Sequence, residues 1–325
     1  MDQETLTRRI ASLCGSESAQ FVESIQSLWS GYGEIVRVGL QPQNKTVVAK
    51  FVFPPTQRSH KYGWSGDTSH QRKLSSYENE LNWYRGAASL CSDSCRVAKL
   101  LASESNDGQW LFVLDDLDTA GFPIRRSRVD DRQLNACLRW LANLHAQFVG
   151  ESESAAAQHG LWPIGTYWHL ETRPDELSAM PDGDLKRAAA AIDQALNQAR
   201  FQTIVHGDAK LANFCFSNDD SVAAVDFQYV GGGCGIKDFA YFISSCFGDA
   251  ECESRESELL GKYFGYLTEA IDDSSLASEI ESEWRALYPF AWADFHRFLA
   301  GWSPGHWKIH SYTQQMTQIV LDRLG

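Results

Sequence analysis

The stretch from 203 to 227, TIVHGDAKLANFCFSNDDSVAAVDF, carries the side chains best suited to chemistry. An apolar run leads into a polar turn that contains Asp208 and Asn213, and two further apolar runs around an acidic turn predict a β-hairpin that reaches Asp226. If the hairpin turn is centred between Asp219 and Asp220, Asn213 faces Asp226. Opposed Cβ atoms in an antiparallel pair lie roughly 4.5–5.5 Å apart, so these two side chains could share one cation.

An amide oxygen and a carboxylate form an incomplete oxygen shell of the kind that Mg²⁺ uses when nucleotide phosphates and water supply its other ligands. Asn213 and Asp226 are therefore the predicted magnesium ligands. Asp208 lies in the same turn and is not needed as a ligand, so its carboxylate could accept a proton from an attacking hydroxyl. A lone HGD triplet is more often structural, and the combination of loop, spacing and hairpin is what favours catalysis.

This constellation resembles the catalytic and metal loops of kinases. The residues that carry the resemblance are His206-Gly207-Asp208, Asn213 and Asp226-Phe227-Gln228. The pattern is most similar to the aminoglycoside phosphotransferase and choline kinase superfamily, especially its ecdysteroid-kinase-like branch. The resemblance implies an α+β, two-lobed protein-kinase-like fold with a small antiparallel-sheet N-lobe and a mainly helical C-lobe. It also implies ATP and Mg as cofactors.

Lys50 interrupts an apolar strand and shares a face of that strand with Val48. A lysine on a buried face needs an anion. The resemblance implies that Lys50 contacts the nucleotide phosphates, that Val48 packs on adenine and that Glu80 orients the lysine, with Glu78 as the competing carboxylate. A strand-edge lysine whose head reaches water is the alternative interpretation.

Gly31 and Gly33 follow a leading helix predicted over residues 1–29 and precede a two-stranded meander. They could let the backbone approach phosphate groups, but a turn between a helix and a strand needs no ligand, so both interpretations stand. The polar segment 54–73 is predicted to be a loop, either a lid or a mobile surface loop. A helix capped by Ser75 or Ser76 is predicted to follow and to carry Glu80.

The apolar strand 110–114 ends in the sequence LDDL, which resembles the hinge strand of these kinases. The resemblance implies that main-chain groups around Asp115 and Leu117 bind adenine. It also places the lobe boundary here, with an N-terminal nucleotide-binding lobe over 1–115 and a C-terminal catalytic and substrate-binding lobe over 116–325. An acidic pair that merely ends a strand is the alternative.

Three further polar residues of the predicted C-terminal lobe are assigned roles. Lys210 lies where protein kinases often place a lysine that touches the transferred phosphate, although many ecdysteroid-kinase-like sequences have an aromatic residue there. Asp238 resembles the aspartate that opens the next helix and braces the catalytic loop. His145 follows the apolar stripe of a helix predicted over 131–148 and is interpreted as a packed core histidine.

Aromatic residues are frequent near the C-terminus. Trp284, Trp292, Trp302 and Trp307 are interpreted as core packing of the large lobe, with a second interpretation in which some of them line the acceptor pocket.

The composition limits the partners of the protein. A net charge of −13 without a long basic tract argues against nucleic acid and against anionic membranes. The first twenty residues contain no apolar signal segment, and no later run has the length of a membrane span, so a soluble cytoplasmic protein is expected. The eight cysteines are expected to be reduced, and Cys91 and Cys95 are interpreted as free thiols rather than zinc ligands.

These observations predict an ATP- and Mg-dependent phosphotransferase that phosphorylates a hydroxyl of a small molecule, a choline-like, sterol-like or aminoglycoside-like alcohol. One alternative is a catalytically inactive kinase-fold module that binds nucleotide. The intact set of Lys50, Asp208, Asn213 and Asp226 argues against it. Another is a kinase of protein side chains, for which the short glycine-rich segment after Phe227 leaves little room for a peptide platform.

Overall fold

The computed structural model describes residues 2–28, 31–54, 66–106 and 108–325. The N-terminal elements are α1 (Gln3–Leu13), β1 (Ser18–Ser27), β2 (Gly33–Gln41), β3 (Lys45–Val52), α2 (Gly66–Arg85), β4 (Leu100–Asn106) and β5 (Gln109–Asp115). The C-terminal elements are α3 (Asp131–Phe148), α4 (Ser152–His159), α5 (Pro174–Ala179), α6 (Asp184–Asn197), β6 (Thr203–Val205), β7 (Phe214–Phe216), β8 (Val222–Ala224), β9 (Gly231–Gly233), α7 (Ile236–Cys246), α8 (Asp249–Ala270), α9 (Ser274–Trp302) and α10 (Ser311–Leu324). The predicted α+β architecture of a sheet lobe and a helical lobe is confirmed, and the boundary after residue 115 stays a prediction.

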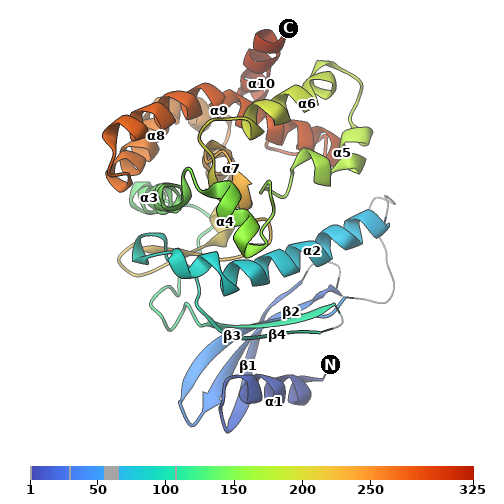
Figure 1. Cartoon of the computed structure of the whole chain (residues 1–325), viewed down its shortest axis with the longest axis vertical. Helices are drawn as coiled ribbons and strands as arrows, with labels where there is room; N and C mark the ends of the chain where they lie inside the picture. The colour runs from blue at the N-terminus through green and yellow to red at the C-terminus, as the bar shows by residue number, and fades with distance from the viewer. Residues whose placement is uncertain (1, 29–30, 55–65, 107) are drawn as a thin grey trace.

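The N-terminal lobe is built on one antiparallel sheet with the strand order β1-β2-β3-β5-β4. Because side chains alternate along each strand, the sheet has two different apolar faces. One face, which includes Val38 and Ala49, packs against Leu6 and Ile10 of α1. Figure 1 shows α1 and α2 on opposite sides of this sheet, with α2 between the sheet and the helical lobe. The face that carries Lys50 therefore points toward α2 and the C-terminal lobe.

Helix α3 shows why the C-terminal lobe folds as predicted over 131–148. Asp130 forms a capping box with Gln133, which satisfies the first free N–H groups of the helix. The apolar stripe of α3 is fully buried in the large core. The Thr203 hydroxyl donates to the His145 carbonyl over 2.7 Å and so ties β6, the strand before the predicted catalytic loop, to this helix.

The leading helix predicted over 1–29 is wrong after Leu13. Gly15 adopts a left-handed φ of 61°, which ends the helix, and β1 then pairs with β2 at the edge of the sheet. Phe21 and Ile25, which the helical interpretation placed on a buried stripe, are 38% and 44% exposed on this strand. The meander of β2 and β3 is confirmed.

Helix α2 begins at Gly66, so the predicted start at Ser75 or Ser76 is also wrong. Ser76 is fully buried inside the helix, and its hydroxyl donates to the Lys73 carbonyl over 2.8 Å. The predicted loop 54–73 is thus helical from 66 onward. Residues 55–65 lie outside the described residues, and the lid prediction falls mostly on them.

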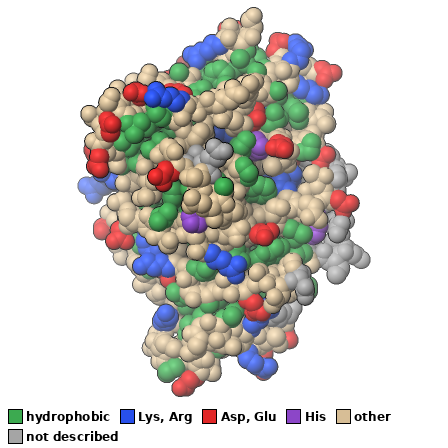
Figure 2. All heavy atoms as spheres, in the orientation of Figure 1, with side chains coloured by type: hydrophobic (Ala, Val, Ile, Leu, Met, Phe, Trp, Pro, Cys, Tyr) green, Lys and Arg blue, Asp and Glu red, His purple; other side chains and the backbone are tan. Residues whose placement is uncertain are grey.

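Three expectations drawn from the composition concern membrane spans, cysteines and surface charge. No helix in the described part of the chain combines the length and apolar character needed to cross a bilayer. Every cysteine is described and none forms a disulfide, as expected. Figure 2 shows acidic and basic side chains interspersed over the face viewed.

Candidate active site

The hairpin formed by β7 and β8 has a register one residue away from the predicted one. Phe214 pairs with Ala224. The turn is centred on Asp219, whose carboxylate accepts hydrogen bonds from the Ser217 hydroxyl and the Ser221 N–H. A turn centred on a residue shifts every pair by one position relative to a turn centred between two residues. The predicted pairings across this hairpin are therefore wrong.

Asn213 and Asp226 are consequently not opposed across the strands. Asn213 faces Val225, whose N–H donates to the Asn213 carbonyl over 3.0 Å. Asp226 follows the ladder with a left-handed φ of 69°. Its carboxylate Oδ1 lies 3.7 Å from Lys50 Nζ, which projects from the N-terminal sheet. Asp226 thus lies at the junction of the two lobes.

Asp208 is held by side chains from three directions. Its Oδ2 accepts hydrogen bonds from Lys210 Nζ over 2.6 Å and from Asn213 Nδ2 over 3.2 Å, while its Oδ1 accepts from the Tyr241 hydroxyl over 3.0 Å. The residue is 7% exposed. Burial raises the pKa of Asp208, and the neighbouring Lys210 ammonium opposes that rise. A fixed carboxylate with a raised pKa is suited to accepting a proton from a hydroxyl.

The catalytic loop rests on Asp238 of α7. The two carboxylate oxygens of Asp238 accept the N–H groups of His206 and Gly207 over 2.5 and 3.0 Å. Asp238 lies in the first turn of α7, after the N-cap Gly235, so it is not itself the N-cap. His145 lies 3.3 Å from the same carboxylate and is fully buried, which confirms its prediction as a core histidine.

Lys50 links the sheet, α2 and the C-terminal lobe. Its Nζ lies 2.6 Å from Glu80 Oε2 and 3.7 Å from Asp226 Oδ1. Lys50 and Glu80 are 4% and 2% exposed, whereas the competing carboxylate, Glu78, is exposed. The strand-edge interpretation of Lys50 is therefore wrong, because the ammonium is buried beside two carboxylates.

The two carboxylates around Lys50 differ in their electrostatics. Burial raises the pKa of Glu80 to about 7, with Lys50 opposing the rise. Burial acts in the same direction on Asp226, but Lys50 and Lys210 outweigh it and hold the pKa of Asp226 below its ordinary value. Gln228 donates to Asp226 Oδ1 over 2.8 Å and orients the carboxylate. Asp226 is thus kept ionised.

The donor set at this junction suits a hard divalent cation. Asp226 contributes an ionised carboxylate, and Asn213 contributes an amide whose nitrogen is turned toward Asp208, with hydrogen bonds of 2.8 Å to its carbonyl and 3.2 Å to its carboxylate. The Asn213 amide oxygen consequently points away from Asp208. Two oxygen donors of this kind match the protein share of a Mg²⁺ shell.

Of the two glycines predicted near phosphate, Gly31 precedes β2 and Gly33 is its first residue. Gly31 has a φ of 74° and open space where a Cβ would lie, whereas a Cβ on Gly33 would lie 2.0 Å from the Phe51 carbonyl oxygen. Backbone packing alone therefore requires glycine at position 33. Val48 lies on the same strand face as Lys50 and is half-buried.

One carboxylate of the predicted hinge, that of Asp115, has a structural role. The Asp115 side chain pairs with Arg96 and accepts the Lys99 N–H, so it anchors the segment before β4. Leu117 is buried. Adenine recognition by main-chain groups at Asp115 and Leu117 stays a prediction.

Sequence comparison supplies the family. The profile described as the phosphotransferase enzyme family matches residues 40–272, a range that contains Lys50, Glu80, Asp208 and Asp226. The chain belongs to this family. No curated protein sequence matches it. The profile match confirms the expected membership of the aminoglycoside phosphotransferase and choline kinase superfamily. The protein is a phosphotransferase.

Solved structures of other phosphotransferases share the fold. A microcompartment-associated aminopropanol kinase superposes with a TM-score of 0.53 at 13% identity, with 98% of this chain and 93% of that chain covered. A thermostable mutant of aminoglycoside phosphotransferase APH(4)-Ia in the apo form gives a TM-score of 0.52 at 10% identity, covering 98% and 99%. The same enzyme in a ternary complex with ADP and hygromycin B gives 0.50 at 9%, covering 98% of each chain. The kinase-like fold is thus confirmed.

Sequence reasoning missed Tyr241 and Lys308 of this candidate site and gave no role to Gln228. Tyr241 bonds Asp208, Gln228 orients Asp226, and Lys308 lies on the loop between α9 and α10 with its Nζ 4.6 Å from the centre of the Tyr241 ring. Gln228 was part of the motif that carries the resemblance, but its hydrogen bond to Asp226 was not foreseen. Lys308 is a hundred residues from Asp208 in the chain, and no local pattern marks it.

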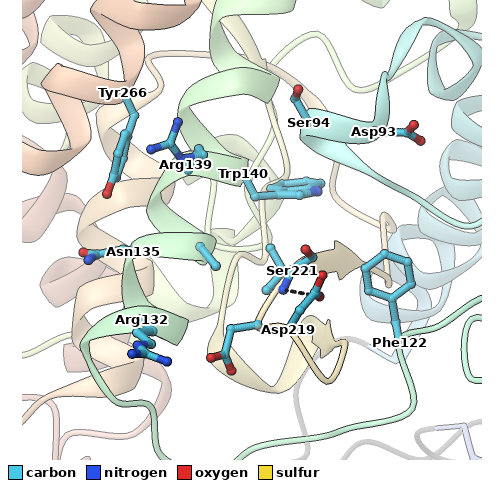
Figure 3. Close-up of a pocket in the computed structure, with 13 residues that line it drawn as sticks. Asp93, Ser94, Phe122, Arg132, Asn135, Arg139, Trp140, Asp219, Ser221 and Tyr266 are labelled. Carbon is cyan, nitrogen blue, oxygen red and sulfur yellow. Dashed lines mark hydrogen bonds between the residues drawn. The ribbon is translucent and has the colours of Figure 1, made fainter.

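A separate pocket of the phosphotransferase lies between α3 and the β7–β8 hairpin (Figure 3). Arg132, Arg139, Asp93 and Asp219 line it, and none of the predicted site residues does. The Trp140 ring lies between this pocket and the catalytic loop, since it lines the pocket and packs edge-on against His206 with ring centres 6.1 Å apart. Its mixed charges give no reason to place substrate there.

Proposed function

We propose that the protein transfers the γ-phosphoryl group of ATP, in the presence of Mg²⁺, to a hydroxyl group of a small molecule. The observation that carries this proposal is the placement of Lys50 within 2.6 Å of Glu80 and 3.7 Å of Asp226. That arrangement joins a buried cation of the small lobe to the candidate metal ligand of the large lobe. The ADP complex of the structurally similar aminoglycoside phosphotransferase also supports a nucleotide here.

The residues around Lys50 would position the nucleotide. Glu80 holds the ammonium in one orientation, so that little side-chain freedom is lost when phosphate binds. Val48, on the same face of β3, would contact the adenine ring, and main-chain groups at Asp115 and Leu117 would hydrogen-bond its edge. Phosphoryl transfer needs chiefly positioning and charge neutralisation, and these residues supply both.

Asn213 and Asp226 would hold Mg²⁺ through their side-chain oxygens. When bound, the cation neutralises charge on the phosphate oxygens. Asp226 is suited to this role because Lys50 and Lys210 keep its pKa low and Gln228 fixes its orientation.

Asp208 would orient the acceptor hydroxyl and accept its proton. Tyr241 and Asn213 hold the carboxylate in place, and Lys210 would contact the transferred phosphoryl group from the same loop. The aminopropanol kinase that shares the fold phosphorylates a small alcohol, as its name states, which supports a small-molecule acceptor here.

The Asp208→Asn variant tests this function. The amide keeps hydrogen-bonding capacity in a buried site but cannot take a proton, so we expect ADP release with an accepted alcohol to fall by about 10²-fold or more. Nucleotide binding, measured by calorimetry with an ATP analogue, should be preserved. Turnover of the variant at the wild-type rate would overturn the proposed role.

A further inference from the structure

A pocket with an unusual charge lies next to the catalytic loop. Its lining includes the cations Arg126, Lys210 and Lys308, together with Ser127, Ser245 and Trp307, and none of its lining residues is acidic. The whole chain carries 42 acidic and 29 basic residues. A pocket whose charged lining residues are all cations is therefore the opposite of the net charge of the protein. Within the described residues, two of these cations, Arg126 and Lys308, form no ion pair with a carboxylate.

Lys308 is the first of them. It is 7% exposed, and its Nζ donates to the Ser244 hydroxyl over 3.2 Å. The rings of Tyr241, Phe295 and Trp307 lie 4.6 to 5.6 Å from the same nitrogen. Within the described residues, no carboxylate forms an ion pair with Lys308. A buried ammonium in this setting costs free energy unless an anion approaches it.

Arg126 is the second. Its Nε is a buried atom without a hydrogen-bond partner in the described part of the chain. A guanidinium normally uses its donors on carboxylate or phosphate oxygens. Arg126 lines the same pocket, so its guanidinium and the unpaired ammonium of Lys308 together indicate an absent anion there.

The pocket is adjacent to the proposed reaction centre. Lys210 lines it and also contacts Asp208 Oδ2 over 2.6 Å. Tyr241 makes a second link, because its hydroxyl bonds Asp208 and its ring lies beside Lys308 Nζ. An anionic group held here would leave a nearby hydroxyl of the same small molecule within reach of Asp208.

Two buried carboxylates of this lobe already have cationic partners. Glu176 is buried and pairs with Arg173 at 3.1 Å. Asp294 is buried between Lys237 and Arg297 at 3.2 and 2.8 Å. A polycationic aminoglycoside would therefore find no free carboxylate in either of these two pairs.

We propose that the acceptor is an alcohol that also bears an anionic group, a carboxylate or a phosphate ester, and that this group binds between Arg126, Lys210 and Lys308. This inference rests on the proposed function, because it assigns the acceptor of that reaction. It narrows the acceptor from alcohols in general to hydroxy acids and phosphorylated alcohols.

Direct binding tests the pocket without turnover. The full-length protein is saturated with Mg²⁺ and a non-hydrolysable ATP analogue, which fills the nucleotide phosphate positions, and is then titrated with inorganic phosphate in a calorimeter. We expect Lys308→Met to weaken phosphate binding by about tenfold or more, as loss of a charge-assisted hydrogen bond does. Lys262→Met is the matched control, because Lys262 lies on α8 and pairs with Glu258 at 2.6 Å.

Turnover with a matched series then tests the acceptor. ADP release is measured with glycerol, glycerate, glycerol 3-phosphate and choline as neutral, carboxylated, phosphorylated and cationic alcohols. We expect kcat/KM to be higher for one or both anionic alcohols than for glycerol, and Lys308→Met to raise the KM of the anionic alcohol about tenfold without changing the KM of ATP. The preference between glycerate and glycerol 3-phosphate identifies the anion.

The two measurements separate the possible failures. Phosphate binding that is absent, or equal in wild type and Lys308→Met, overturns the anion site. A kcat/KM for choline or glycerol that equals the kcat/KM for the anionic alcohols overturns the anion site too. If the enzyme releases no ADP with any of the four alcohols, the proposed function fails. The calorimetric comparison still decides whether the pocket binds an anion.

Discussion

Burial lowers the pKa of Lys308 to about 8, because three aromatic rings surround the ammonium and exclude water. Asp208, Cys246 and Cys252 act in the opposite direction, and Lys210 adds to the lowering. A single buried residue of this kind destabilises the folded chain at neutral pH. Residues that reduce stability are often kept for function.

The Lys308→Met variant should therefore be more stable than the wild type at pH 7. Between the folded pKa near 8 and the unfolded value of 10.5, the unfolded chain binds more protons, so the wild type gains stability as pH rises through this window. We expect an advantage for the variant on the order of 3 kcal/mol at pH 7 that disappears by about pH 10.5. Urea unfolding in phosphate-free buffer measures it.

The control for this pH dependence is again Lys262→Met, whose lysine lies at the surface beside Glu258. That substitution should leave the free energy of unfolding within about 0.5 kcal/mol of the wild type at each pH. An advantage of Lys308→Met that stays constant from pH 7 to pH 10.5 would contradict the argument.

Helix α7 acts on the site as an element, since it supplies both the support of the catalytic loop and the hydroxyl that bonds Asp208. Asp238 in its first turn holds two loop N–H groups, and Tyr241, one turn later, reaches Asp208. These two residues lie three apart, so one face of the helix holds the loop and the carboxylate together.

Asp238→Ala should remove this support. Two buried N–H groups and His145 would lose their acceptor, which costs about 2–4 kcal/mol in the free energy of unfolding. The rate of ADP release should fall as well, because Asp208 would no longer be fixed. Chemical denaturation and a turnover assay measure the two effects. Asp182→Ala, at an exposed pair with Lys186, is the control and should change neither.

Substitutions at Gly31 and Gly33 test whether these glycines are needed for backbone packing or for phosphate binding. A Cβ on Gly33 would meet the Phe51 carbonyl at 2.0 Å, whereas a Cβ on Gly31 would meet nothing. We expect Gly33→Ala to lower the free energy of unfolding by about 2 kcal/mol more than Gly31→Ala does. Denaturation curves measure this difference. Equal stability of the two variants with loss of ATP affinity in both would favour the phosphate interpretation instead.

The two lobes of the whole molecule meet where Lys50 of the sheet approaches Asp226 of the helical lobe. A ligand that contacts both residues binds only the folded arrangement and therefore stabilises the entire chain. Nucleotide and metal are expected to act together here, because the proposed metal ligands and the lysine proposed to bind phosphate lie at the same junction.

Thermal unfolding should reveal this coupling. At about 100 times its Kd, a Mg²⁺-bound ATP analogue is expected to stabilise the protein by about 2.7 kcal/mol. Chelation of the metal, or the Asp226→Asn substitution, should remove most of that gain. A shift in Tm that is the same with and without Mg²⁺ would show that the nucleotide binds independently of the metal.

The sequence was sufficient for those parts of the site that lie in one local segment or follow a strong period. The sequence predicts the loop from His206 to Asn213, the alternation that places Lys50 on one face of β3 and the stripe of α3, because all three depend on neighbours a few residues away. The pairing of Lys50 with Glu80 followed from family resemblance together with helical spacing.

Tertiary structure decided what depends on distant partners. Residues 18–27 form a strand because they pair with the edge of β2. The β7–β8 turn is centred on Asp219, which accepts hydrogen bonds within it, and not between Asp219 and Asp220 as predicted. The pocket between Arg126, Lys210 and Lys308 brings together three segments far apart in the chain. No local pattern encodes such a meeting, because it arises from the packing of the loop after α9 against α7.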